Sequence, residues 1–117
     1  MRRSVLVVDD HPGFRSFLSV YLTACGYSVV GEAADGAAAL REAARLSPDV
    51  VLLDVHLPDH DGFEIARRLA DRPSRPAVIM ISSRDDPDYA VRAIASATCG
   101  FVAKSRLSRE SLERMLE

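Results

Sequence analysis

The sequence lacks the features that mark disulfide-rich, zinc-binding and membrane proteins. Its 117 residues include only two cysteines, Cys25 and Cys99, which are far apart and belong to no C-x-x-C or Cys/His pattern. A disulfide framework and a zinc site are therefore both disfavoured. The apolar run near the N-terminus is broken at Asp9, before a signal peptide or a membrane span could form. We expect a cytoplasmic protein with free thiols and no membrane contact.

An excess of positive charge is also absent. Fifteen Lys and Arg residues against seventeen Asp and Glu residues give a formal net charge of -2, which offers no electrostatic footprint for a nucleic-acid backbone or an anionic membrane. Neither is expected as a partner of this chain. The length suits one domain over residues 1–117, which is long enough to bury most of its apolar surface.

The sequence does contain five short apolar runs, each followed by a segment of helical periodicity. This alternation is typical of successive βα units. Three runs are continuously apolar, as strands are when helices cover both faces of a parallel sheet, and the second run is more mixed, which suits an edge. The predicted strands are Ser4–Val8, Ser28–Ala33, Val50–Asp54, Ala77–Ser82 and Gly100–Ala103.

The first two helical segments have recognisable ends. The first carries one apolar stripe and stops at Gly26. The second is predicted to begin after Asp35 as its N-cap and to end at Leu46, before Pro48. The residues of the first stripe, all expected in the core, are Phe14, Phe17, Leu18, Tyr21, Leu22 and Cys25.

Three further helices complete the alternation. The third follows Gly62, and in the fourth Asp86 can cap while Pro87 suits the first helical position. In the last, Ser108 can cap and Leu107 can pack on Leu112 as a hydrophobic staple. The predicted inward residues are Ile65, Ala66 and Leu69 in the third helix, Ala90, Ala93, Ile94 and Ala97 in the fourth, and Leu112, Met115 and Leu116 in the last.

Polar side chains gather where the predicted strands end. Asp9 and Asp10 follow the first strand, Asp54 ends the third, Ser82 ends the fourth and Lys104 follows the fifth. In an open parallel sheet these carboxyl ends meet at one edge, which is where ligands bind. Each residue alone has an ordinary explanation as a cap, a turn or a solvated charge. Together, three acids at one edge cost energy unless a cation lies between them.

A divalent metal would resolve this crowding, and Mg²⁺ prefers oxygen ligands while keeping coordination positions open for a phosphate. One carboxylate could then act as a nucleophile that accepts a phosphoryl group. The metal and a lysine could neutralise charge on the transferring oxygens. The residues therefore suggest Mg²⁺-dependent phosphoryl transfer.

Four motifs in order, "VLVVDDHP", "VVLLDVHLPDHDG", "VIMISS" and "GFVAKS", resemble the receiver (CheY-like) domain of two-component response regulators. The resemblance covers residues 1–117, and "DDHP" with Lys-Ser is most similar to the NarL/FixJ class. It implies a doubly wound, flavodoxin-like α/β fold. In that fold a five-stranded parallel sheet of order 2-1-3-4-5 is flanked by five helices.

The resemblance also implies roles for the residues at the strand ends. Asp54 would accept a phosphoryl group from a sensor histidine kinase, and Asp9 and Asp10 would hold Mg²⁺ together with Asp54 and the backbone carbonyl of His56. Asp10 would be a direct ligand and Asp9 would act largely through water. Lys104 would pair with the phosphoryl group.

Other matching positions concern the response to phosphorylation. Ser82 matches the switch hydroxyl, although Ser83 is an alternative because strand ends are uncertain by a residue. Phe101 matches the aromatic whose rotamer follows the switch. His56 and Arg84, two residues past Asp54 and Ser82, are expected to set the lifetime of the phosphorylated state.

Two positions depart from the family pattern. Ala97 stands where a glycine is usual, so a left-handed backbone there would be strained. Ser105 follows Lys104 where many receivers have a cis proline, so a cis peptide is not expected there. Both lie near the strand that carries Phe101.

The expected function is a phosphorylation switch in signal transduction or a phosphorelay. It would not be a conventional enzyme, although it would catalyse its own phosphorylation and slow dephosphorylation. Receivers of this class usually precede a helix-turn-helix domain that regulates transcription, so the chain is either a stand-alone receiver or a fragment whose DNA contact lies in an absent C-terminal domain. A homodimer could form through helix four, strand five and helix five, or through helices one and five.

Two alternatives remain at this point. The chain could be a degenerate receiver that serves as an interaction module without phosphorylation. It could also be a small Mg²⁺-dependent aspartyl-phosphate phosphohydrolase, but such enzymes usually place a second acid just after the nucleophile. Here Val55 and His56 follow Asp54.

Overall fold

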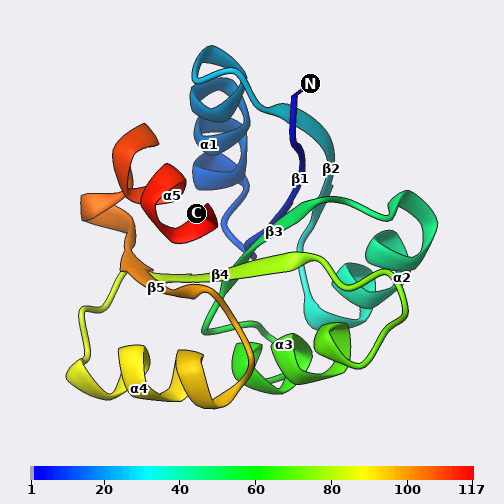
Figure 1. Ribbon diagram of the computed structural model, residues 1–117, viewed down its shortest axis with the longest axis vertical. Helices are drawn as coiled ribbons and strands as arrows, with labels where there is room; N and C mark the ends of the chain where they lie inside the picture. The colour runs from blue at the N-terminus through cyan, green and yellow to red at the C-terminus, as the bar shows by residue number, and fades with distance from the viewer. Residues whose placement is uncertain (1) are drawn as a thin grey trace.

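The computed structural model describes residues 2–117. Strands and helices alternate along the chain as predicted (Figure 1). The elements are β1 (Ser4–Val8), α1 (Pro12–Ala24), β2 (Ser28–Ala33), α2 (Gly36–Leu46), β3 (Val50–Asp54), α3 (Gly62–Ala70), β4 (Ala77–Ser82), α4 (Pro87–Ala95), β5 (Gly100–Ala103), a 3₁₀ turn η1 (Lys104–Arg106) and α5 (Arg109–Leu116).

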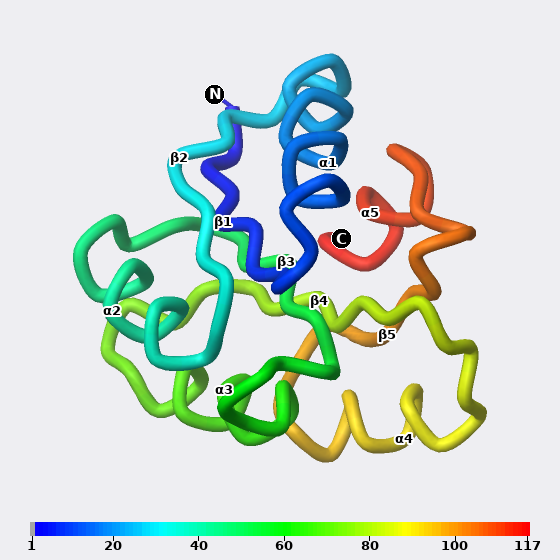
Figure 2. The backbone as a smooth tube through the Cα atoms, turned by 180° about the vertical axis from the view of Figure 1, so that it is seen from behind, coloured from blue at the N-terminus to red at the C-terminus, as the bar shows by residue number. Residues whose placement is uncertain are grey.

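The five strands form one parallel sheet in the order β2-β1-β3-β4-β5. This confirms the predicted doubly wound, flavodoxin-like arrangement. Helices α1 and α5 cover one face of the sheet, and α2, α3 and α4 cover the other (Figures 1 and 2). Because every connection is a crossover between parallel strands, the carboxyl ends of all five strands lie at one edge.

Alternating strand residues feed two hydrophobic cores, one under each helical layer. Leu6, Leu53 and Met80 contribute to the core beneath α2, α3 and α4. Val7, Leu52 and Ile79 belong to the core beneath α1 and α5. The continuous apolar character of β1, β3 and β4 follows from this, because both faces of these strands are buried.

The predicted helix ends agree with the structure. Asp35 caps α2 by accepting a hydrogen bond from the Ala38 N–H at 2.8 Å, and Asp86 caps α4 by accepting one from Asp88. Ser108 forms a capping box with Ser111 at the start of α5. The second strand lies at the sheet edge, as its mixed sequence predicted.

The predicted core faces of two helices need correction. Phe17 was expected inside, but its residue is 60% exposed, and it stacks on the surface against Tyr21 while Leu18 and Leu22 enter the core. In α4, Ala90 is exposed and Ile94 is 72% exposed, and Ala97, which lies beyond the end of α4, is exposed as well. The side chains that pack inward are Tyr89, Ala93 and the polar Ser96.

The two positions that depart from the family pattern behave as expected. Ala97 has φ 60°, a left-handed conformation that disfavours residues other than glycine. The peptide bonds of residues 2–117 include none in the cis form, which agrees with Ser105 following Lys104. Cys25 and Cys99 are free thiols. No helix of this part of the chain combines the length and apolar character needed to cross a membrane.

Candidate functional site

Three acidic side chains meet at the carboxyl edge of the sheet. Asp9 and Asp10 follow β1, and Asp54 is the last residue of the neighbouring strand β3. One carboxylate oxygen from each lies within 4.8 Å of the others. Asp9 and Asp54 are buried, at 0% and 4% exposure, whereas Asp10 is exposed. The structure thus brings together the acids that the sequence predicted to converge.

Lys104 supplies the positive charge at this cluster. Its Nζ lies 3.1 Å from Asp54 Oδ2 and also contacts Asp9 Oδ2. The ammonium sits 4.4 Å from the centroid of the Phe14 ring, in a cation–π arrangement. Lys104 follows β5, which is two strands away from β3, so it reaches across the edge of the sheet.

The two buried carboxylates are held by backbone groups as well. Asp9 Oδ1 accepts a hydrogen bond from the His11 N–H at 2.8 Å, and the Asp9 carbonyl accepts one from Arg15 at 2.7 Å. Asp54 Oδ1 accepts a hydrogen bond from the His56 N–H at 3.0 Å. The bonds from His11 and His56 fix Oδ1 of each carboxylate and leave Oδ2 facing Lys104, whereas Arg15 holds the backbone of Asp9.

Burial and charge act in opposite directions on these groups. Burial raises the pKa of Asp54, and this outweighs the hydrogen bond from His56 and the charge of Lys104, which lower it. Burial alone would lower the pKa of Lys104, but its contacts with Asp9 and Asp54 raise it above the ordinary value. The lysine therefore stays charged, and its charge favours the ionised form of Asp54.

Asp9 has a feature that suits a metal ligand. Its Oδ2 is buried and in contact with the Lys104 ammonium, and one of its oxygens lies within 4.8 Å of oxygens of Asp10 and Asp54. The donor atoms at this edge are all oxygen, which matches the preference of Mg²⁺.

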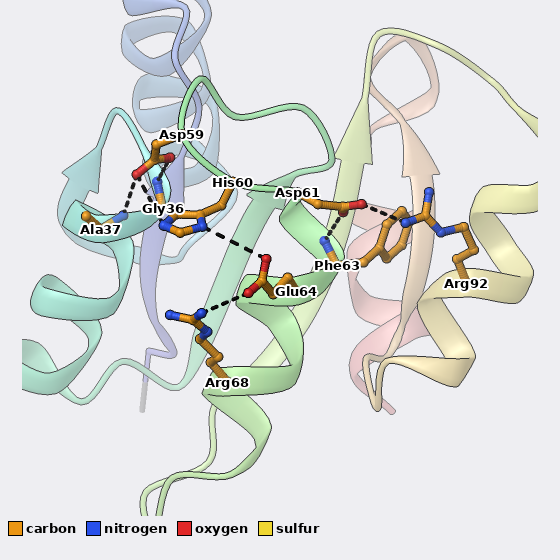
Figure 3. A network of polar contacts seen from close by, with 9 residues as sticks. All are labelled: Gly36, Ala37, Asp59, His60, Asp61, Phe63, Glu64, Arg68 and Arg92. Atoms are coloured by element: carbon orange, nitrogen blue, oxygen red, sulfur yellow. Dashed lines mark hydrogen bonds and ion pairs between the residues drawn. The ribbon is translucent and has the colours of Figure 1, made fainter.

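The loop between β3 and α3 is tied to three helices (Figure 3). Asp59 accepts hydrogen bonds from the backbone N–H groups of Gly36 and Ala37 at the start of α2. Asp61 caps α3 through the Phe63 N–H and forms an ion pair with Arg92 of α4 at 2.8 Å. This loop directly follows Asp54, so these contacts hold the backbone beside the site.

Gly62 makes the close approach of this loop possible. A Cβ atom at residue 62 would overlap the Asp54 carbonyl oxygen and would lie 2.9 Å from the Val55 Cα. The Gly62 N–H donates to the Val55 carbonyl at 2.9 Å. The glycine therefore positions the end of β3.

Ser82 and Phe101 occupy the next two strands. Ser82 is fully buried at the end of β4, and its Oγ accepts a hydrogen bond from the Arg84 N–H at 3.1 Å. Ser83 is exposed. Phe101, on β5, is partly buried and meets the ring of Tyr89 edge-on, with centroids 5.3 Å apart.

Sequence reasoning missed three residues around the site. Tyr89 was not assigned to the buried face of α4, yet its hydroxyl lies 2.7 Å from His56 Nε2. Phe14 was placed in the core without its contact to Lys104, and the bond from Arg15 to Asp9 was not foreseen. The spacing of Tyr89, Ala93 and Ser96 at i, i+4 and i+7 could have revealed the buried face of α4.

The fold and this edge define a class of signalling domain, and comparison with known proteins agrees. The family "response regulator receiver domain" matches residues 5–117. The chain belongs to this family. Family membership does not favour a degenerate interaction module or a phosphohydrolase.

Individual relatives support the same assignment. The probable transcriptional regulatory protein NarL of Mycobacterium tuberculosis is 37% identical over 114 residues, which is 97% of this chain and 53% of that protein. Its solved receiver domain superposes with a TM-score of 0.84 at 34% identity, covering 98% of this chain and 93% of that one. The chain spans about half the length of the curated relatives it matches.

A second solved relative was captured with ligands. The CheY protein of Borrelia burgdorferi, in a complex with CheX, BeF₃ and Mg²⁺, has a TM-score of 0.85 at 25% identity, covering 97% of this chain and 86% of that one.

Proposed function

We propose that Asp54 is the phosphoacceptor of this receiver and takes its phosphoryl group from a histidine kinase. An Asp54 oxygen would form a bond to phosphorus while the N–P bond of the phosphohistidine breaks. The electron pair of that bond returns to the imidazole, which then takes up a proton. The observation that carries the proposal is the convergence of Lys104, Asp9 and Asp10 on the Asp54 carboxylate.

Asp9, Asp10, Asp54 and the His56 carbonyl would hold Mg²⁺. The close approach of the three acids, two of them buried, and the all-oxygen donor set support this assignment. When bound, the ion would neutralise charge on the transferring phosphoryl oxygens. Lys104, already 3.1 Å from Asp54 Oδ2, would pair with one of those oxygens.

The switch would run through Ser82 and Phe101. Ser82 Oγ is buried at the end of β4 and can donate to a phosphoryl oxygen on Asp54. We prefer it to Ser83 because Ser83 is exposed. Movement of Ser82 would open space that Phe101 can enter, and this would change the surface formed by α4, β5 and α5.

His56 and Arg84 would set how long the phosphoryl group lasts. Both are exposed and lie two residues past Asp54 and Ser82. Substituting both should change the autodephosphorylation rate and leave Mg²⁺ affinity nearly unchanged. An unchanged rate would refute this role.

The partners would be a sensor histidine kinase in the cytoplasm and, through an output domain, DNA. A homodimer would use either of two surfaces: α4 exposes Val91 and Ile94, and α1 exposes Phe17 and Val20. Exposed apolar residues of this kind often mark association sites. Sizing the protein before and after phosphorylation tests this expectation.

Intact mass tests the phosphoacceptor proposal. The protein would be incubated with Mg²⁺ and a small phosphodonor, alongside Asp54→Ala and the control Asp71→Ala, whose exposed acid lies at the end of α3. Wild type and Asp71→Ala should each gain one phosphoryl mass that is slowly lost, and Asp54→Ala should gain none. Equal labelling of all three, or steady hydrolysis of a phosphomonoester, would contradict the proposal.

A further inference from the structure

A hydrogen bond joins the loop after the phosphoacceptor to α4. His56 Nε2 lies 2.7 Å from the hydroxyl oxygen of Tyr89, and the two rings meet edge-on with centroids 5.8 Å apart. His56 is the second residue after Asp54, whereas Tyr89 lies in the first turns of α4. The bond therefore connects the loop that follows Asp54 to helix α4.

Packing fixes the position of Tyr89. The residue is only 5% exposed, and its ring packs against Phe101 at 5.3 Å and Phe63 at 5.9 Å between centroids. Its burial and its contact with Phe63, which do not depend on the rotamer of Phe101, leave the ring little rotational freedom. His56, by contrast, is exposed. The tyrosine hydroxyl is thus the fixed partner, and it orders the imidazole.

His56 is held at two points. Its backbone N–H donates to Asp54 Oδ1 at 3.0 Å, and its ring is bonded to Tyr89. The residue also lines an open groove of ≈ 410 Å³ together with Asp59, Asp61 and Arg92. Solvent therefore reaches the groove beside the imidazole, but its Nε2 atom already has a hydrogen-bond partner in Tyr89.

We propose that Tyr89 is a positioning residue that prolongs the phosphorylated state by occupying Nε2 of His56. The inference rests on the proposed role of Asp54. Loss of the phosphoryl group is hydrolysis: a water oxygen bonds to phosphorus, the bond to Asp54 breaks with its electron pair returning to the carboxylate, and the water's protons pass to phosphate and solvent. An imidazole nitrogen beside the site can orient such a water. Because Nε2 is already bonded to the Tyr89 hydroxyl, it is not free to orient that water.

Tyr89→Phe tests the inference, because it keeps the ring and removes only the hydroxyl. The first-order loss of phosphoryl mass should accelerate on the order of tenfold, a fraction of the 10²–10⁴ that a well-placed acid–base group can supply. The matched control is Tyr21→Phe. The Tyr21 hydroxyl accepts a hydrogen bond from Arg109 on the other face of the sheet, so its removal should leave the rate unchanged.

A double-mutant cycle separates positioning from a general loss of structure. In a His56→Ala background, Tyr89→Phe should have no further effect on the rate, because the nitrogen it releases is gone. The ¹⁵N chemical shifts of the His56 imidazole should change in Tyr89→Phe. The midpoint of denaturant unfolding should stay nearly the same as that of wild type.

The possible failures are distinguishable. If Tyr89→Phe gains the phosphoryl group normally but loses it at the wild-type rate or more slowly, Tyr89 does not have this role, and the same holds if it accelerates loss equally without His56. If wild type gains no phosphoryl group, the proposed function fails and this inference fails with it.

Discussion

At the scale of single residues, one cationic side chain neutralises the two buried acids of the site. Lys104 is the only lysine of the sequence, and its ammonium contacts the carboxylates of both Asp9 and Asp54. Leaving a buried charge without its partner is costly, because the charge has lost its water and gains nothing in return. Lys104 therefore contributes to stability as well as to the proposed chemistry.

Lys104→Met should lower the free energy of unfolding by about 3 kcal/mol at neutral pH without Mg²⁺, since two buried carboxylates lose their counter-charge. Urea denaturation measures this change. Mg²⁺ should stabilise the variant more than wild type, because the ion can replace the missing charge. Arg109→Met is the control: its exposed pair with Glu113 should be worth less than about 1 kcal/mol. Equal losses in both variants would argue against this role of Lys104.

Gly62→Ala should both destabilise the protein and impair phosphorylation. The added Cβ would overlap the Asp54 carbonyl oxygen, so the end of β3 must shift. We expect a loss of about 1–3 kcal/mol, as for other overpacked sites, together with slower labelling by a small phosphodonor. Gly13→Ala, in α1, would meet no atom within 4 Å and should be neutral or stabilising by about 0.5–1 kcal/mol. If Gly62→Ala behaved like Gly13→Ala, the close approach would not matter.

At the scale of elements, strands were easier to predict than helix faces. The strands β1, β3 and β4 are buried on both sides, so an unbroken apolar run is enough to locate them. The inward face of α4 contains Tyr89 and is continued by its C-cap Ser96, whereas its outward face contains Val91 and Ile94. Hydrophobicity alone therefore gave the wrong face, because a polar atom with a buried partner can replace an apolar group.

The site was predictable for a similar reason. Asp9 and Lys104 directly follow a strand and Asp54 and Ser82 end one, and parallel strands bring their carboxyl ends to one edge whatever the details of packing. The contact between His56 and Tyr89 depends on the rotation of α4 about its axis. The spacing of Tyr89, Ala93 and Ser96 indicates that rotation, but it does not say which loop side chain the Tyr89 hydroxyl meets, so the contact itself could not be predicted.

The loop after β3 links elements through Asp59. Hydrogen bonds from the Gly36 and Ala37 N–H groups lower the pKa of this carboxyl and outweigh the opposing effect of burial. A carboxyl group whose pKa is lower in the folded state stabilises the fold above its unfolded pKa, about 3.9, and this contribution is lost as the pH falls through the folded value.

Asp59→Ala should therefore be less stable than wild type at pH 7, and the difference should shrink as the pH falls below about 4. Denaturant unfolding across this range measures it. Asp71→Ala, at the exposed end of α3, serves as the control and should show a small difference with little pH dependence. A deficit that stayed constant down to acid pH would mean that the charge of Asp59 plays no part.

At the scale of the whole molecule, the site and the surfaces that could report on it are separate. The acids lie at the carboxyl edge, while α4, β5 and α5 form a side of the molecule (Figure 1). Phosphorylation must favour one arrangement of that side by on the order of 5 kcal/mol to reverse the populations almost completely. Under the proposed function, a doubly charged phosphoryl group held by Lys104, Ser82 and Mg²⁺ would supply such a difference.

The most direct test of the central claim is to follow backbone amide NMR signals during a Mg²⁺ titration, and then after adding a phosphodonor. Mg²⁺ should shift Asp9, Asp10, Asp54 and His56 first, and phosphorylation should extend the changes to Ser82 and Phe101. The opposite end of the sheet has its own groove of ≈ 530 Å³, lined by residues that include Arg2, Arg3, Tyr27 and Arg109. Changes centred on that groove, or none at the carboxyl edge, would contradict the account.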